Sequence, residues 1–116
     1  MGMGDLAYAC EKFFGALNVM ATSAKSRRDR LLIAYSGSAV RANPRSTDEG
    51  GDVSSELVAR IREFHLRMKA AEPVADEGAV AATVHSMSNA EVRRATEELV
   101  AICWAMYQES RWSEGS

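Results

Sequence analysis

The sequence has few residues of the kinds that cross-link small proteins covalently or through a metal. It contains two cysteines, Cys10 and Cys103, and two histidines, His65 and His85. One disulfide at most can form, so the chain is not a disulfide scaffold. The spacings Cys-x-x-Cys, His-Glu-x-x-His and Glu-x-x-His, which place metal ligands on one face, do not occur. We therefore expect a fold held by a hydrophobic core, with no metal and no cofactor.

Proline, long apolar runs and nucleotide-binding signatures are also scarce or missing. The only prolines are Pro44 and Pro73, which leaves long stretches free to be helical. No run approaches the ~18 apolar residues of a membrane helix, and the first residues lack a basic leader. The pattern Gly-x-x-x-x-Gly-Lys is absent. A cytoplasmic protein without membrane contact is the expectation.

The composition is that of an ordinary globular domain. The chain has 116 residues, of which 47% are hydrophobic and 26% charged, so we expect one domain over residues 1–116. The net charge of −2 is unevenly distributed, because residues 1–45 carry +4 and residues 46–116 carry −6. Such asymmetry most often reflects which helix faces are solvated, although it can also favour self-association or a charged partner.

The C-terminal stretch gives the strongest structural signal. Ser88 and Glu91 form a capping-box pattern, and no glycine or proline follows until Gly115. One face of the predicted helix carries apolar residues at helical spacing, namely Val92, Ala95, Leu99, Ile102, Cys103 and Met106. Val100, Trp104 and Tyr107 widen this face to roughly 200°, beyond the ~100° stripe of a surface helix. Such a helix needs cover on more than one side.

The N-terminal third predicts one long helix or two. Leu6, Cys10, Phe13, Leu17 and Met20 form a stripe over about Asp5–Met20, and Phe14 broadens it. A second helix over about Arg27–Ala42, restarted by a Ser26 cap, is suggested by the pair Ser26 and Asp29. Without a proline or glycine between them, residues 5–42 can also form a single helix. Asn43-Pro44 ends the pattern.

Residues 44–52 have no apolar side chain apart from the proline, so a solvated, mobile loop is predicted. A third helix should follow from residue 53 or 54 to Ala71, capped by Asp52 or Ser54. Its inward stripe is predicted to be Leu57, Ile61, Phe64 and Met68, with Val58 and His65 at the margin, and Glu56–Arg60 and Glu63–Arg67 as i,i+4 pairs on the wet face.

A short fourth helix, capped by Asp76, should align Val80, Val84 and Met87 before the Ser88 helix begins. The tail 113–116 should fray. Since no alternating pattern indicates a strand, the predicted fold is all-α. It is a compact bundle of four to five mainly antiparallel helices.

A basic cluster is one candidate site. Lys25, Arg27, Arg28 and Arg30 lie near a predicted helix start, where they could contact successive phosphates of a nucleic acid without sequence preference. Asp29 interrupts the run, and no interleaved aromatic residue could stack on bases. A solvated face or a protein-binding patch is therefore the preferred interpretation, with nucleic-acid binding as an alternative.

A second candidate is the segment Arg60-Ile-Arg-Glu-Phe-His65. Its arginine and histidine, separated by four residues on a helix, are similar to the short Arg/His motif of the HEPN ribonuclease family. The resemblance implies an all-helical dimer in which Arg60 and His65 serve RNA cleavage. Ile61 stands where the family usually has a polar residue. The simpler interpretation is a histidine packed beside Val58 with one wet ring edge.

The third candidate lies on the C-terminal helix. Arg93, Val100, Trp104 and Tyr107 share a line displaced from the core stripe, and arginine and aromatics are enriched at interface hot spots. The competing interpretation is that another helix of the chain covers them. We interpret the protein as a non-enzymatic interaction module, such as an accessory subunit, inhibitor or regulator. Its expected partner is another protein or a second copy of itself, with which it would form a homodimer.

Overall fold

The predicted all-α bundle is confirmed. The computed structural model describes residues 4–73 and 78–115, without the side chains of residues 112–115. Within these residues the chain forms five α-helices and no strand. The elements are α1 (Asp5–Thr22), α2 (Arg27–Gly37), the 3₁₀ turns η1 (Ala39–Arg41) and η2 (Thr47–Glu49), α3 (Ser55–Met68), α4 (Ala79–Ser86) and α5 (Asn89–Gly115).

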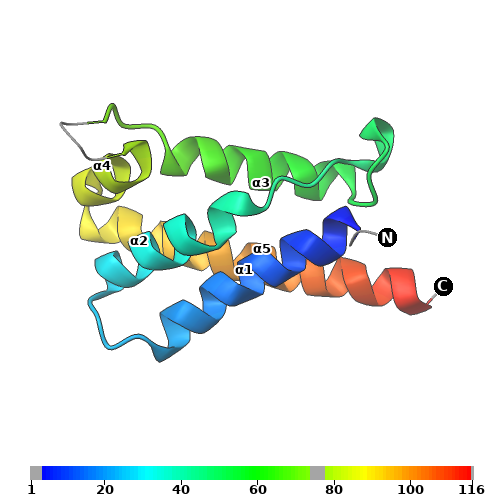
Figure 1. The fold of residues 1–116 in the computed structure, drawn as a ribbon, viewed down its shortest axis with the longest axis horizontal. Helices are drawn as coiled ribbons and strands as arrows, with labels where there is room; N and C mark the ends of the chain where they lie inside the picture. The colour runs from blue at the N-terminus through cyan, green and yellow to red at the C-terminus, as the bar shows by residue number, and fades with distance from the viewer. Residues whose placement is uncertain (1–3, 74–77, 116) are drawn as a thin grey trace.

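The longest helix, α5, is the centre of the bundle. It packs against α1, α2 and α3, and it runs antiparallel to α1 and α3 (Figure 1). The short helix α4 closes one end, where it contacts α2 and α3. The described parts of both chain ends lie at the opposite end of the molecule (Figure 1).

Residues 5–42 form two helices, not one. The Ser26 side chain accepts a hydrogen bond from the Asp29 N–H at 3.2 Å, as an N-cap should, and α2 starts at the next residue. The prediction that α2 continues to Ala42 was wrong, because the α-helix ends at Gly37. Ser38 instead donates its hydroxyl to the Lys12 carbonyl at 2.7 Å, so it fixes the chain to α1 and a 3₁₀ turn follows.

The buried faces follow the predicted stripes, except that the buried face of α1 is rotated about the helix axis. All six core positions predicted on α5 are buried, and so are Leu57, Ile61, Phe64 and Met68 of α3. On α1 the core face turns toward Ala9 and Ala16, which are fully buried, while Cys10 and Leu17 are half-buried. Small residues here allow α1 to approach its neighbours closely.

Two polar contacts set the ends of α3. Ser54 caps the helix by accepting from the Leu57 N–H, and the Glu109 carboxylate of α5 accepts from both the N–H and the hydroxyl of Ser54, at 2.8 and 2.6 Å. The predicted end at Ala71 was wrong, because α3 ends at Met68. The Ala71 N–H is donated to the Thr83 hydroxyl of α4 at 2.9 Å, which directs the chain away from the helix axis.

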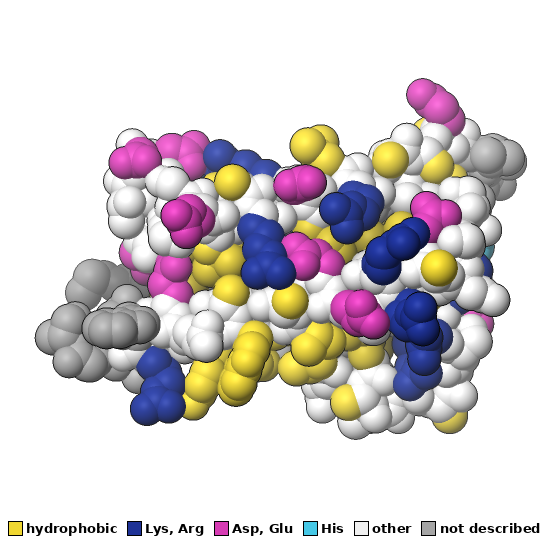
Figure 2. Space-filling model, turned by 180° about the vertical axis from the view of Figure 1, so that it is seen from behind, with side chains coloured by type: hydrophobic (Ala, Val, Ile, Leu, Met, Phe, Trp, Pro, Cys, Tyr) yellow, Lys and Arg dark blue, Asp and Glu magenta, His cyan; other side chains and the backbone are white. Residues whose placement is uncertain are grey.

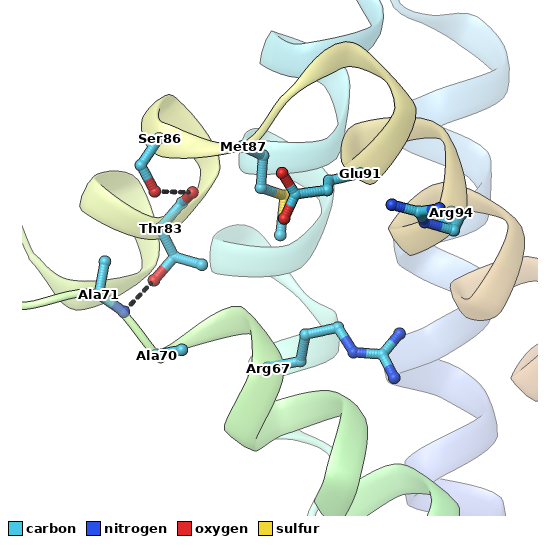
Figure 3. A pocket seen from close by; sticks show the side chains of 8 residues that line it. All are labelled: Arg67, Ala70, Ala71, Thr83, Ser86, Met87, Glu91 and Arg94. Carbon is cyan, nitrogen blue, oxygen red and sulfur yellow. Dashed lines mark hydrogen bonds between the residues drawn. The ribbon is translucent and has the colours of Figure 1, made fainter.

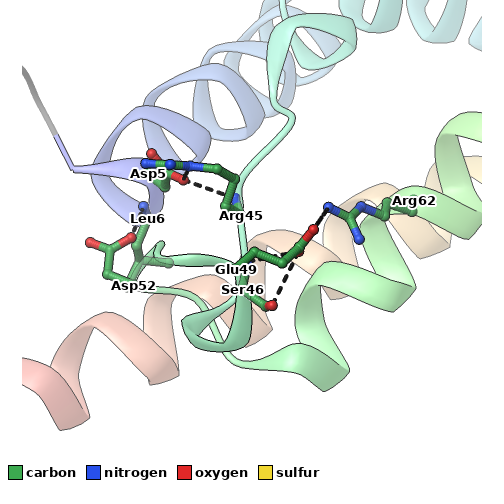
Figure 4. A network of polar contacts seen from close by, with 7 residues as sticks. All are labelled: Asp5, Leu6, Arg45, Ser46, Glu49, Asp52 and Arg62. Atoms are coloured by element: carbon green, nitrogen blue, oxygen red, sulfur yellow. Dashed lines mark hydrogen bonds and ion pairs between the residues drawn. The ribbon is translucent and has the colours of Figure 1, made fainter.

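Residues 44–52 are tied to two helices, α1 and α3 (Figure 4). Asp52 does not cap α3; it accepts from the Leu6 N–H at 2.8 Å and so serves the start of α1. Asp5 accepts from the Arg45 N–H, which lowers the pKa of its carboxyl. Glu49 binds Arg62 of α3 at 2.9 Å and completes a capping box with Ser46. The mobility of this loop stays a prediction.

Gly51 allows this loop to close. A Cβ atom at Gly51 would lie 2.1 Å from the Arg45 carbonyl oxygen, inside the contact distance of any side chain. The two ends of the loop can therefore meet only with glycine there, and the Thr47 N–H then donates to the Val53 carbonyl at 2.9 Å.

His65 is not a marginal residue with a wet ring edge, as predicted, but lies in the core at 6% exposure; Val58 is also buried. The His65 Nε2–H donates to the Ala42 carbonyl at 2.6 Å. Nδ1 of the same ring therefore carries no hydrogen and accepts from the Tyr35 hydroxyl. Phe64 meets the Tyr35 ring edge to face at 5.6 Å. This cluster joins α2, α3 and the segment after η1.

The Ser88 cap of α5 is confirmed, because Ser88 and Glu91 exchange hydrogen bonds at 3.1 Å. The Asp76 cap predicted for α4 lies outside the described residues, and Gly78 precedes that helix. Helix α5 extends to Gly115. The predicted fraying of 113–116 concerns residues whose side chains are not described and stays a prediction.

We predict that His65 makes the fold acid-sensitive. Burial lowers its pKa below the ordinary 6.5, so below pH 6.5 the unfolded chain takes up a proton that the folded chain refuses. The free energy of unfolding should then decrease as the pH is lowered below 6.5, by at most about 1.4 kcal/mol per pH unit. Urea unfolding of His65→Gln between pH 7 and 5.5 should show a flatter dependence than the wild type.

The control is Val58→Ala on buried Val58, which lowers stability without removing a titratable group and should keep the wild-type slope. The range stops at pH 5.5 because carboxyl groups with lowered pKa values, such as those of Glu49 and Glu91, begin to contribute at lower pH. An unchanged slope in His65→Gln would contradict the assignment of the acid sensitivity to this ring.

Candidate docking surface

The most exposed aromatic side chain among those described is on α5. Trp104 is 63% exposed, and its ring stacks on Tyr107 with centroids 5.5 Å apart and planes 6° from parallel. Tyr107 and Val100 are 41% and 42% exposed. The chain's own helices therefore leave this part of the wide apolar arc uncovered. We call Val100, Trp104 and Tyr107 the aromatic face.

The aromatic face extends toward α1. Cys103, the residue before Trp104, donates its thiol to the Phe13 carbonyl at 3.4 Å, which places the middle of α5 beside the middle of α1. The next residue of α1, Phe14, is 38% exposed. Hydrophobic side chains gather along the lower edge of the molecule with a basic side chain at one end (Figure 2).

Charged residues continue the line of the aromatic face at both ends. Arg93, Glu97, Val100, Trp104, Tyr107 and Arg111 follow one another at spacings of four and three residues, so they share one side of α5. Arg111 lies over the Tyr107 ring at 5.8 Å. Arg93, predicted as part of the patch, is exposed on the same line but lies two turns before Val100.

The sequence reasoning missed Glu97 and Arg111. Arg111 follows Tyr107 by four residues, which is the spacing that brings a cation over a ring on a helix. That signal was present in the sequence. Glu97 forms no hydrogen bond or ion pair with any residue that the structure describes.

The basic cluster is divided by the fold. Arg28 turns inward and donates to the Val84 and Met87 carbonyls, both at 2.6 Å, and to Asn89 at 3.0 Å. Arg30 donates to the Met20 carbonyl at 3.3 Å. Both arginines thus satisfy carbonyl groups at helix ends. Lys25 and Arg27 stay exposed, so two of the four predicted cations are fully available to a ligand.

A groove of about 440 Å³ lies beside this cluster, between Ser26, Arg27, Arg28, Arg30, Asn89 and Val92. The Arg30 Nε is buried without a hydrogen-bond acceptor. Three arginines line this groove, but the guanidinium groups of Arg28 and Arg30 are engaged by the chain's own carbonyls.

Arg60 and His65 point to different places. The Arg60 guanidinium forms two hydrogen bonds of 2.8 Å with Glu98 of α5, and not with the predicted partner Glu56. His65 has both ring nitrogens occupied in the core. The structure of the single chain therefore does not bring the two side chains together around a shared space.

A groove of about 630 Å³ lies where α3, α4 and α5 meet. Arg67 of α3 and Arg94 of α5 line it, and Glu91 lies beside Met87 in its wall (Figure 3). Glu91 is already committed to the Ser88 cap. The described residues that line the groove include no cysteine, no histidine and no second carboxylate beside Glu91.

Among the side chains described, no three His, Cys, Asp or Glu residues cluster as metal ligands would. None of the described helices combines the length and the apolar composition that crossing a membrane requires.

We predict that Arg28 is a structural residue and Arg27 is not. Arg28→Met keeps the aliphatic stem but removes the guanidinium donor of the Met87 carbonyl and one of the two donors of the Val84 carbonyl, so it should lower the free energy of unfolding by about 1–3 kcal/mol. Arg27→Met removes the same charge from an exposed side chain and should change it by less than about 0.5 kcal/mol. Urea unfolding measures both. Equal decreases in the free energy of unfolding for the two variants would show that the loss of a positive charge, and not the loss of the Arg28 hydrogen bonds, determines the effect.

The comparisons with known proteins give no family: no protein-family model matches the chain, and neither a curated protein nor a solved structure matches it.

Proposed function

We propose that the protein is a small, non-enzymatic, cytoplasmic interaction module that docks through the aromatic face of α5. The observation that carries the proposal is the stack of Trp104 on Tyr107, which projects from the bundle with Trp104 63% exposed. A partner protein with a complementary surface would bind by covering this face, and the protein would act through that binding alone.

The chemistry of the face favours a protein partner. Tryptophan, tyrosine and arginine are the residue types most enriched among interface hot spots, and here Trp104, Tyr107 and Arg111 are in contact with one another. Each square ångström of apolar surface that a partner removes from water contributes about 25 cal/mol. Single exposed apolar residues are common on monomers, whereas a continuous line of them is not.

The face is also ordered before binding. Trp104 and Tyr107 lie on a helix whose opposite side, including Leu99 and Met106, is fully buried. The stacking of the two rings restricts their rotamers, so less conformational entropy is lost when a partner binds. A rigid pair of aromatic anchors is what a docking site needs.

The other functions receive less support. For RNA cleavage, His65 would have to leave two hydrogen bonds in the core. For binding of nucleic acid by the cluster from Lys25 to Arg30, half of the cations would have to leave helix-end carbonyls. Two free cysteines, Cys10 and the buried Cys103, fit a reducing compartment.

We predict that Trp104→Asp abolishes partner binding without unfolding the protein. Trp104 is exposed, so the substitution should lower the free energy of unfolding by less than about 1 kcal/mol. This small cost comes from the low helix propensity of aspartate. The tagged wild type and variant, expressed in the native host, are used to capture partners, which are then quantified by mass spectrometry. The specific partner should be lost from Trp104→Asp.

Leu66→Asp is the matched control. Leu66 is 74% exposed on α3, and the substitution introduces the same charge on another helix. It should retain the partner. A partner that binds the Trp104→Asp variant as well as the wild type would refute the aromatic face as the docking site.

A further inference from the structure

We infer that the occupant of the aromatic face is a second copy of this chain, in a two-fold symmetric dimer in which two α5 helices pack antiparallel about Trp104. The inference rests on the proposed function, because it uses the same face. It adds the identity of the partner and the register of the contact.

The register follows from the position of the charges. Glu97 precedes Trp104 by seven residues, and Arg111 follows it by seven. In an antiparallel pair with the two-fold axis at Trp104, a residue before the axis faces the residue equally far after it on the other copy. Glu97 therefore faces Arg111 of the partner subunit, and the symmetry repeats this pair at the other end. The two pairs flank the apolar centre at separations of about 10 Å along each helix.

Other registers bring like charges together. In a parallel pair in register, each charged residue of the line faces its own copy, so Glu97 meets glutamate and Arg111 meets arginine. If the axis of an antiparallel pair is shifted to Ile102, Arg93 faces Arg111 of the partner subunit at both ends. Like charges placed opposite each other oppose association. Only the register about Trp104 combines apolar contact at the centre with unlike charges at the ends.

Both charged groups are available for this pairing. Glu97 is exposed and has no hydrogen-bonding or ionic partner in the described part of its own chain. Arg111 is exposed, and within the described part of the chain its guanidinium interacts with the Tyr107 ring alone, a contact that an added carboxylate does not exclude. The Glu97 carboxylate and the Arg111 guanidinium lie on the same side of α5 as the exposed aromatic rings.

The contact extends beyond α5 to α1. A stable interface buries about 800 Å² on each partner, more than Val100, Trp104 and Tyr107 provide. Phe14 of α1, 38% exposed, adds to the apolar area beside α5. Because the area is modest, we expect a reversible dimer with a dissociation constant on the order of micromolar.

The test is a charge exchange followed by sedimentation equilibrium of the purified full chain at about 1–500 µM, a range that spans micromolar affinities. Glu97→Arg and Arg111→Glu each turn two attractive pairs into two repulsive ones, so each should raise the dissociation constant at least about tenfold. The double variant exchanges the signs and should return it to within about threefold of the wild type. Trp104→Asp should be monomeric.

Arg93→Glu separates the two antiparallel registers. With the axis at Ile102 it would create an attractive pair with Arg111 of the partner subunit and tighten the dimer, whereas with the axis at Trp104 it should not. Tightening by Arg93→Glu, or a double variant as weak as the single ones, would overturn the register. A wild type that stays monomeric would overturn self-association. The capture experiment is then unaffected, because a different protein on the same face would still be lost with Trp104→Asp.

Discussion

The width of the apolar arc on α5 constrains how α1, α2 and α3 pack. Its buried side meets α1, α2 and α3, so the helix lies at the centre of the bundle and not at its edge. Three neighbours cover the stripe from Val92 to Met106 but leave Val100, Trp104 and Tyr107 uncovered. The hydrophobic effect therefore explains both features: the buried part of the arc assembles the fold, and the exposed remainder gives the molecule a surface that favours association.

Polar side chains fix how the helix ends meet. Arg28 joins the start of α2 to the corner between α4 and α5, and Glu109 joins α5 to the start of α3. Asp52 acts in the same way at the start of α1. Each contact satisfies a backbone group that helix geometry leaves without a partner. These residues sit at helix ends, where hydrogen bonds are directional, whereas the middle of each helix is held by non-directional apolar packing.

The aromatic face and the charges around it form one functional hypothesis. Apolar area supplies most of the free energy of association, and charge chooses among the possible orientations. Glu97 and Arg111 at equal distances from Trp104 give α5 a symmetry that a two-fold dimer can use. The two basic grooves, by contrast, are lined by arginines that already bind carbonyls or lie beside a committed glutamate. Arginine thus has a structural role at the helix ends, and the role that we propose for Arg111 is a different one, in association.

The sequence by itself determined the fold class, a bundle of four to five helices, and most of the core stripes, because helical periodicity and caps such as Ser54 and Ser88 are local properties. It could not determine where α2 and α3 end, because Ser38 and Ala71 are held by residues of other helices. The burial of His65 depended on Tyr35 and Ala42, 30 and 23 residues away in the chain. Whether Trp104 was covered, and which arginines remained free, depended on how the helices packed. Such contacts depend on the relative positions of helices, which no local pattern specifies.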